Sequence, residues 1–206
     1  MAIYHSAIFD SLRNKLSNTV LYKKGPDGII RTRPAKVKNP RTADQLFQRA
    51  RMKVVIELSR RFAPIIIAGF CNRPIRLSVY NMFTKLNVMN VEVDDQFRAT
   101  PERKKLVVSD GVLQTPNISM EKAGNSIKFT GNPQSADGLS AGDDNIYAGL
   151  YCETAQASRL HKIGTRAKGG STEFVLPEGW NLDTTHVYVF AVSRSKKRTS
   201  PTLYLE

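Results

Sequence analysis

The sequence contains few of the residues that form catalytic and metal sites. It has two cysteines and three histidines among 206 residues. Cys71 and Cys152 lie far apart and lack C-x-x-C spacing, so they predict neither a zinc site nor a disulfide framework. His5, His161 and His186 lie in different parts of the chain, without a carboxylate at the spacing of a catalytic motif. We therefore expect no enzyme activity, no cofactor and no bound metal.

Long apolar runs and phosphate-binding loops are also lacking. No run reaches the roughly 18 apolar residues that a membrane span needs, and the segment Met1–Ser6 does not open a secretory signal. The glycine-containing segments at 138–144 and 168–171 lack the strand-to-helix context and the Lys-Ser/Thr ending of a phosphate loop. These observations predict surface loops, no membrane segment, and synthesis in the cytosol, which is that of the host cell if the gene is viral.

Positive charge is abundant and unevenly distributed. The chain has 31 Lys and Arg against 18 Asp and Glu, a net charge of +13. Residues 1–110 hold 21 basic and 9 acidic residues, net +12, whereas residues 111–206 hold 10 and 9, net +1. A basic half of this kind attracts polyanions or an acidic partner surface. At about 100 to 200 residues per domain, the contrast favours two domains, at 1–100 and 104–206, joined near Ala99–Arg103.

The first third of the chain predicts short strands and then a long helix. Residues 2–18 fit either an irregular arm or one short helix, while 19–23 and 28–33 are β-rich runs joined by Lys24-Gly25-Pro26-Asp27, as in a hairpin. Residues 34–38 are expected to continue as an extended basic arm.

The helical pattern runs from Pro40, with Asn39 as the expected N-cap, to about Phe62. Pro64 is expected to break it, and residues 65–70 to form a buried apolar turn. A second helix is expected from Leu77 to Val88.

The second half changes to a strand-like pattern. Short runs of β-formers are bounded by Gly, Pro, Asn, Asp and Ser, as in a β-sandwich. The expected strands are 105–111, 126–130, 145–152, 172–176, 186–192 and 202–205. The last two resemble the closing hairpin of immunoglobulin and fibronectin type III-like folds. The fold class is therefore α+β: an N-terminal hairpin plus helices, followed by an immunoglobulin/fibronectin III-like β-sandwich.

Hydrogen-bond donors gather where the basic arm meets the first helix. On a helix that begins at Pro40, residues 41, 45 and 49 are i,i+4 neighbours on one face. Two interpretations are open: these groups cap the helix and tie it to the arm, or they bind a partner chain. The candidate partner-binding residues are Arg31, Arg33, Lys36, Lys38, Arg41, Gln45 and Arg49.

Several blocks of the sequence resemble a known family. They are Val37–Thr42 with Gln45 and Arg49, Gly69-Phe70, Tyr80-Asn81, Val107–Leu113, and His186–Tyr188 with Tyr204-Leu205. In this order they resemble the proteins of Bacteroidota and their phages grouped as domain of unknown function 6266. Departures are the opening Ile3–Phe9, where such proteins have a Gly-rich segment, and Arg73–Arg76. The Asn-Pro-Arg-Thr-x-x-Gln-x-x-x-Arg block also resembles one found in small phage virion proteins.

The resemblance implies no known enzyme activity and favours a structural protein. We expect a non-enzymatic component of a phage virion or phage-like assembly, whose basic arm and helix pack against other virion proteins or against copies of itself. The alternative is a nucleic-acid-binding protein that uses the basic half on phosphates. The expected location is the virion, assembled in the host cytoplasm, or otherwise the bacterial cytoplasm.

Overall fold

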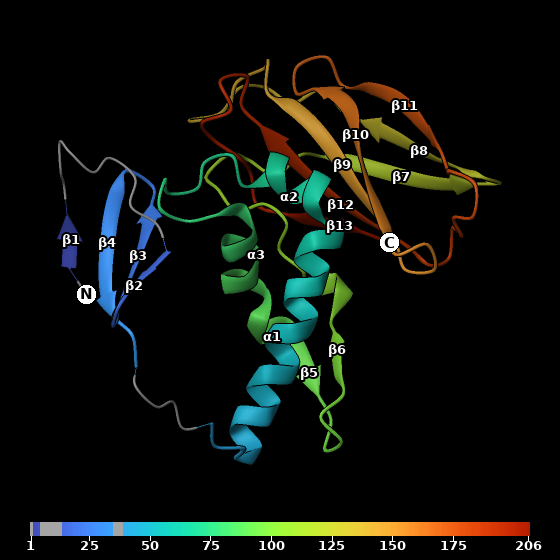
Figure 1. The fold of residues 1–206 in the computed structure, drawn as a ribbon. Coiled ribbons are helices and arrows are strands. Elements are labelled where there is room, and N and C mark those ends of the chain that lie inside the picture. The colour runs from blue at the N-terminus through green and yellow to red at the C-terminus, as the bar shows by residue number, and fades with distance from the viewer. Residues whose placement is uncertain (1, 5–13, 35–38) are drawn as a thin grey trace.

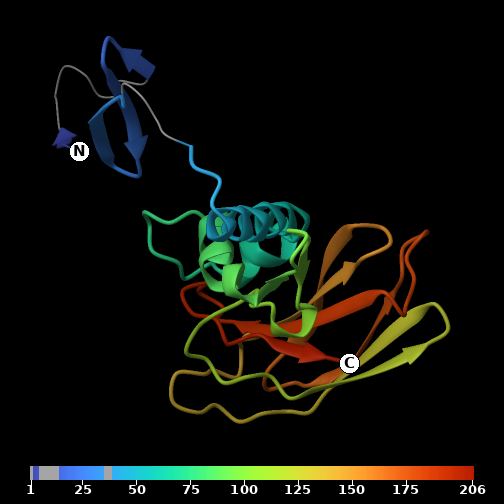
Figure 2. The ribbon, with the colours of Figure 1, turned by 90° about the horizontal axis from the view of Figure 1, so that it is seen from below.

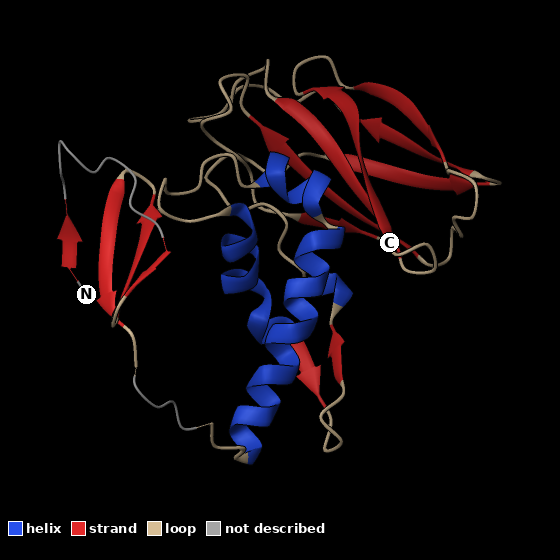
Figure 3. Ribbon diagram, in the orientation of Figure 1, coloured by secondary structure: helices blue, strands red, loops and turns tan. Residues whose placement is uncertain are grey.

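The computed structural model describes residues 2–4, 14–34 and 39–206. They form three parts: an N-terminal sheet, a helical layer, and a pair of facing sheets in the C-terminal half (Figure 1, Figure 3). The class is mixed α+β with antiparallel sheets, as predicted, and the C-terminal half is consistent with a β-sandwich.

The N-terminal sheet has four strands in the order β1-β4-β3-β2. The two β-rich runs that the sequence indicated are its central pair, which is antiparallel across Gly25-Pro26. Gly25 has φ +65, a conformation that glycine adopts without strain. In the described part of residues 2–18 the chain forms two short edge strands, and the predicted short helix is not seen there. The strands are β1 (Ala2–Tyr4), β2 (Asn14–Leu16), β3 (Thr19–Lys24) and β4 (Asp27–Thr32).

The helical layer differs from the prediction at its boundaries. The first helix begins three residues later than expected, with Thr42 in the N-cap position. Pro64 occupies the first turn of a new helix, where its missing N–H is not needed, so the expected turn at 65–70 is helical. The next helix is capped by the Ser78 hydroxyl, which accepts from the Asn81 N–H at 3.1 Å. The elements are α1 (Ala43–Arg61), α2 (Ala63–Gly69), α3 (Val79–Asn87), η1 (Val88–Asn90), β5 (Val91–Val93) and β6 (Ala99–Pro101).

The segment expected to be a strand at 105–111 is instead irregular, and it follows the short helix η2 (Arg103–Lys105). Side chains satisfy its backbone in place of a neighbouring strand. Asn87 accepts from the Val107 N–H at 2.7 Å and donates to the Val107 carbonyl at 2.8 Å. The Thr202 hydroxyl oxygen accepts from the N–H groups of Val108 and Ser109. The prediction of a strand here was wrong, because apolar β-forming residues can be buried without hydrogen-bonding to a neighbouring strand.

The C-terminal half contains two antiparallel sheets, ordered β10-β9-β12-β13 and β11-β8-β7. Five of their strands fall where the sequence predicted them, and β7 and β10 were not predicted. The strands are β7 (Ile118–Ala123), β8 (Ser126–Gly131), β9 (Asn145–Cys152), β10 (Ala157–Thr165), β11 (Gly170–Val175), β12 (Thr185–Val192) and β13 (Leu203–Leu205).

The four-stranded C-terminal sheet is buried on both faces, so this part of the molecule has three layers (Figure 2). Along β12, Val187 and Val189 face the three-stranded sheet, while Tyr188 and Phe190 face the helices. Helix α2 approaches β9 closely: a Cβ on Gly149 would lie 2.5 Å from Ile65.

One hydrophobic core therefore contains side chains from the helices and from the four-stranded sheet, and it crosses the predicted boundary at 100–104. Its buried members include Phe62, Ile66, Phe83, Tyr151, Tyr188 and Phe190.

Candidate functional site

The predicted partner-binding residues do not form one stripe. Arg31 is exposed on β4, with its guanidinium carbon 6.0 Å from the centre of the Tyr22 ring, and Arg33 is exposed just after that strand. Lys36 and Lys38 lie outside the described residues. The first helix begins at Ala43, so Arg41 precedes it and is not an i,i+4 neighbour of Gln45 on a helix.

Arg49 makes its contacts within its own chain. Its Nη2 donates to the Asn39 Oδ1 at 2.5 Å and to the Pro40 carbonyl at 3.3 Å. The Asn39 side chain is therefore used as an acceptor for a guanidinium instead of as a helix cap. These contacts fit the first of the two interpretations, in which the donors tie the helix to the preceding arm. The buried Gln45 Oε1 finds no hydrogen-bond partner among the described residues.

A groove follows the exposed side of α1 and the start of α3. One hollow of about 430 Å³ lies over the N-terminal half of α1, and a second of about 520 Å³ lies between α1 and α3; Ile56 borders both. We call this surface the α1–α3 groove. Of the described residues, those that line it include no carboxylate. They are Gln45, Gln48, Arg49, Met52, Lys53, Ile56, Ser59, Arg60, Ser78, Tyr80, Asn81 and Thr84.

Apolar side chains in this groove are partly open to solvent. Ile56 is 39% exposed and Tyr80 is 43% exposed, and Lys53 and Arg60 on α1 supply positive charge beside them. Such a surface suits an amphipathic partner that carries acidic residues. The sequence reasoning did not name Ile56 or Tyr80 as candidate site residues.

The N-terminal sheet is set apart from this body in both views (Figure 1, Figure 2). Asp27, at the β3–β4 turn, forms an ion pair with Arg76 of the α2–α3 loop at 2.7 Å. Among the described residues, the buried apolar side chains of the sheet are Leu21 and Ile29, and neither belongs to the cores of the body. The described part of the sheet therefore has only a small core of its own.

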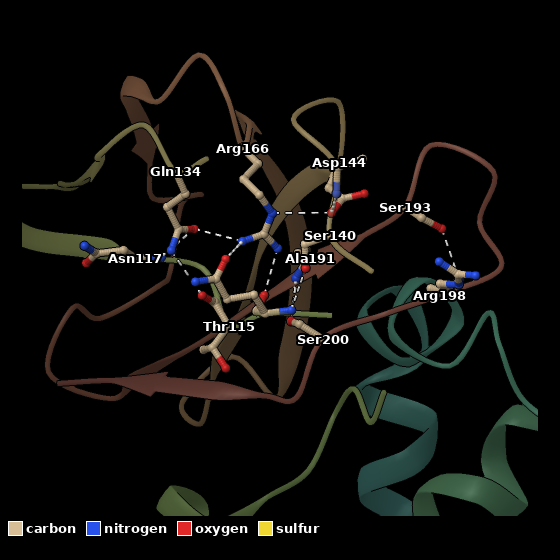
Figure 4. A network of polar contacts seen from close by, with 12 residues as sticks. Thr115, Asn117, Gln134, Ser140, Asp144, Arg166, Ala191, Ser193, Arg198 and Ser200 are labelled. Carbon is tan, nitrogen blue, oxygen red and sulfur yellow. Dashed lines mark hydrogen bonds and ion pairs between the residues drawn. The ribbon is translucent and has the colours of Figure 1, made fainter. Parts of the chain in front are cut away.

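A buried polar network lies between loops of the C-terminal half (Figure 4). Arg166 is fully buried. Its Nη2 donates to the Gln114 carbonyl at 2.7 Å, its Nη1 to Gln134 Oε1 at 2.9 Å, and its Nε to Asp144 Oδ2 at 3.3 Å. The Asp144 carboxylate also accepts from the Ala141 N–H. With its donors used inside the protein, Arg166 joins three loops, and its role is structural.

A second polar cluster lies where η2 meets the C-terminal sheets. Glu153 Oε1 accepts from Arg103 Nε at 2.5 Å and lies 3.4 Å from His186 Nε2, while His186 Nδ1 is 2.9 Å from the Tyr204 hydroxyl. Burial acts to raise the pKa of Glu153, but the hydrogen bond and charge of Arg103 outweigh it and hold that pKa below its ordinary value.

The electrostatics of this cluster do not prepare a nucleophile. Burial raises the pKa of Tyr204, which keeps its phenol protonated at neutral pH. Burial also lowers the pKa of His186, against the effect of the Glu153 carboxylate. Tyr188 donates to the Arg103 carbonyl at 2.9 Å. The cluster therefore attaches η2 to the C-terminal sheets.

Metal ligands, thiols and long apolar helices provide no further candidate site among the described residues. In the part of the chain that the structure describes, no group of three or more His, Cys, Asp or Glu residues is placed to hold a metal ion. Cys71 and Cys152 are both free thiols. Of the helices at 43–90 and 103–105, none combines the length and apolar character of a membrane span.

Comparison with known protein families matches residues 14–206 to DUF6266, a family of unknown function. No curated protein and no solved structure matches the chain.

Proposed function

Because the chain belongs to DUF6266, whose function is unknown, we propose a function from its surfaces: a non-enzymatic structural component of a phage virion or phage-like assembly. Its subunits pack against other assembly proteins, or against copies of the same chain, through the N-terminal sheet, the basic segment after it, and the α1–α3 groove. The Bacteroidota and phage setting is part of the proposal and rests on the sequence resemblance.

The observation that carries the proposal is the small core in the described part of the N-terminal sheet, where the buried apolar side chains are Leu21 and Ile29. A sheet of four short strands needs an apolar face packed on another surface for stability. A neighbouring subunit supplies such a surface in an assembly.

We further infer that the C-terminal sheets form a fibronectin type III-like accessory domain. Taken in chain order as strands A, B, C, C′, E, F and G, β7 to β13 give the sheets A-B-E and C′-C-F-G. This arrangement supports the immunoglobulin/fibronectin III-like topology expected from the sequence. Such a fold licenses no activity by itself and is compatible with a displayed or decorating domain.

The test is to purify phage-like particles from cells that carry the gene and to look for this protein by mass spectrometry, with a gene-deletion strain as control. We expect a fixed copy number per particle that survives a high-salt wash, and density for the C-terminal sheets in a cryo-EM map. A protein that stays outside the particles, which assemble normally without it, would contradict the proposal.

A matched pair of variants tests the α1–α3 groove. Ile56→Glu places a carboxylate in the groove and is expected to lower incorporation at least tenfold. Ile67→Glu changes an equally apolar residue of α2, which is 56% exposed and lies outside the groove, and should leave incorporation unchanged. Equal incorporation of both variants would remove the groove from the proposed interface.

The second candidate function is nucleic-acid binding by the basic half, favoured by the net charge of +12 in residues 1–110. Under that alternative, replacing Arg41 and Arg49 by lysine would leave nucleic-acid affinity unchanged, because a point charge suffices for diffuse phosphate attraction.

A further inference from the structure

Two loops that are far apart in the sequence meet at one carbonyl oxygen. The Asp110 carbonyl accepts from Asn72 Nδ2, in the loop after α2, and from the Thr199 hydroxyl, which precedes β13, each at 3.1 Å. A Cβ on Gly111 would lie 2.2 Å from the Thr199 carbonyl oxygen, so this packing is close. The loop after α2 is thereby joined to the segment that follows the β12–β13 turn, while the Arg73 guanidinium of that loop donates to the carbonyls of Leu77 and Phe70.

The turn between β12 and β13 is held in one shape. The Ser193 N–H donates to the Arg198 carbonyl at 2.9 Å, and the Ser193 hydroxyl accepts from the N–H groups of Lys197 and Arg198. Lys196 has φ +56, in the left-handed region that side chains rarely adopt. The Lys196 N–H donates to the Ser193 carbonyl at 2.8 Å, so this conformation closes a tight turn.

This turn presents a concentration of cations. Arg194, Lys196, Lys197 and Arg198 are all exposed. Three of them, Arg194, Lys197 and Arg198, line an open hollow of about 540 Å³ with Ser193 and Ser195, and Leu139, Ala141, Asp143 and Asp144 border its other side. Of the carboxylates nearby, Asp144 is buried with Arg166, and Asp143 lies 3.7 Å from Arg194 Nη1.

We propose that this β12–β13 turn binds the phosphate backbone of a nucleic acid. Guanidinium and ammonium groups are the side chains that bind phosphate oxygens, by forked hydrogen bonds and by charge respectively. The volume of the hollow, about 540 Å³, lies within the range of small-ligand sites. The site lies in the C-terminal half, outside the basic segment to which the sequence pointed, and it is separate from the α1–α3 groove. It therefore does not depend on the proposed assembly role.

The experiment measures binding of the full chain to fluorescent 25-nucleotide DNA and RNA, each single- and double-stranded, by anisotropy from 50 to 300 mM salt. The test variant is Arg194→Gln/Lys197→Gln/Arg198→Gln. The control is Lys122→Gln/Lys128→Gln/Arg159→Gln, which removes three exposed charges from β7, β8 and β10, outside the turn, the α1–α3 groove and the basic half. We expect the test variant to weaken binding at least tenfold at 100 mM salt and to reduce the salt slope by about 0.7 for each lost single-strand contact, or about 0.9 for each duplex contact. The control should change affinity less than threefold.

Equal losses in the two variants would mean diffuse attraction by net charge and would overturn the proposal, as would the absence of binding by the unaltered chain. Poly-glutamate that competes as well as an oligonucleotide of equal charge would also overturn it, in favour of an acidic polypeptide ligand. The corresponding Arg194→Lys/Arg198→Lys variant keeps the charge and checks folding; it should retain binding within about fivefold.

Discussion

Arg166 shows how much one side chain of this protein holds together. Its carboxylate partner Asp144 is 1% exposed, so removing the guanidinium leaves a buried charge without its counter-ion. We expect Arg166→Met to lower the free energy of unfolding by about 3–5 kcal/mol, measured by urea denaturation. Adding Asp144→Leu should recover part of that loss.

Asp143→Asn is the matched control, because Asp143 is an exposed neighbour; it should change stability by less than about 0.5 kcal/mol. A loss below about 1 kcal/mol in Arg166→Met would show that water replaces the network.

Two histidines are expected to make the fold sensitive to acid. Burial lowers the pKa of His161 and of His186. Since the unfolded value is about 6.5, the unfolded chain takes up these protons first as the pH falls. The stability that the two residues contribute is therefore complete above about pH 6.5 and is lost as the pH falls towards their folded values. We expect His161→Gln/His186→Gln to lose less stability than the unaltered chain between pH 7.5 and 5.

Urea denaturation at the two pH values measures this difference. Glu153, whose pKa lies below its ordinary 4.5, titrates mainly below that window. An identical drop in the variant and the unaltered chain would assign the acid sensitivity to other groups.

At this scale the sequence predicts little of the site. The partners of Arg166 lie 22 to 52 positions away along the chain, and no local pattern indicates them. The sequence showed that Arg41, Gln45 and Arg49 can donate hydrogen bonds, but it did not show how they are arranged. Their arrangement depends on where the helix starts, and Arg49 binds Asn39 just ahead of that start.

At the scale of elements, side chains replace a strand at 107–109. The Thr202 hydroxyl oxygen accepts from two backbone N–H groups and its hydrogen is donated to the Ser109 carbonyl at 2.8 Å. Thr202→Val keeps the shape and removes these acceptor and donor roles. We expect it to cost about 1–3 kcal/mol of unfolding free energy and to speed hydrogen exchange at Val108 and Ser109.

Thr130→Val, on an exposed position of β8, should cost less than about 0.5 kcal/mol in the same denaturation experiment. Unchanged exchange at Val108 and Ser109 in Thr202→Val would mean that water satisfies these groups equally well.

The start of α1 allows a second prediction for an element. Arg49→Lys removes the Nη2 group that contacts both Asn39 and Pro40, but the site is exposed, so we expect a cost below about 1 kcal/mol. Arg41→Lys, ahead of the helix, should cost nothing measurable. Thermal unfolding compares the stability of the two variants. A larger loss of stability in Arg41→Lys would instead support a helix that starts at Pro40, as the sequence predicted.

The strands β9 and β12 were identified because they are runs of apolar β-formers, and the structure buries them along most of their length. The missed strands β7 and β10 carry charged residues on exposed positions, which interrupt their apolar pattern.

At the scale of the whole molecule, the shared core predicts that the two expected domains unfold together. Helices occur only before residue 106, and the single tryptophan, Trp180, packs against the core between the two C-terminal sheets. We expect helical circular dichroism and Trp180 fluorescence to report the same urea midpoint, because Phe62 and Tyr188 belong to one core that spans both parts.

Limited proteolysis complements this measurement. Trypsin should cut first after the exposed Arg41, and a cut near Arg98 should leave fragments that stay associated. Two separate midpoints, with fragments that divide near residue 100 and separate, would instead support independent folding of 1–100 and 104–206.

The double burial of β12 has a consequence for how this family can change. Its alternate residues belong to different interfaces, with valines towards one sheet and Tyr188 and Phe190 towards the helices. Deleting one residue within the strand would exchange the two sets and put large rings where small side chains fit. In relatives, insertions and deletions should therefore collect in the connecting loops and be absent from this strand, because each of its two interfaces constrains the register.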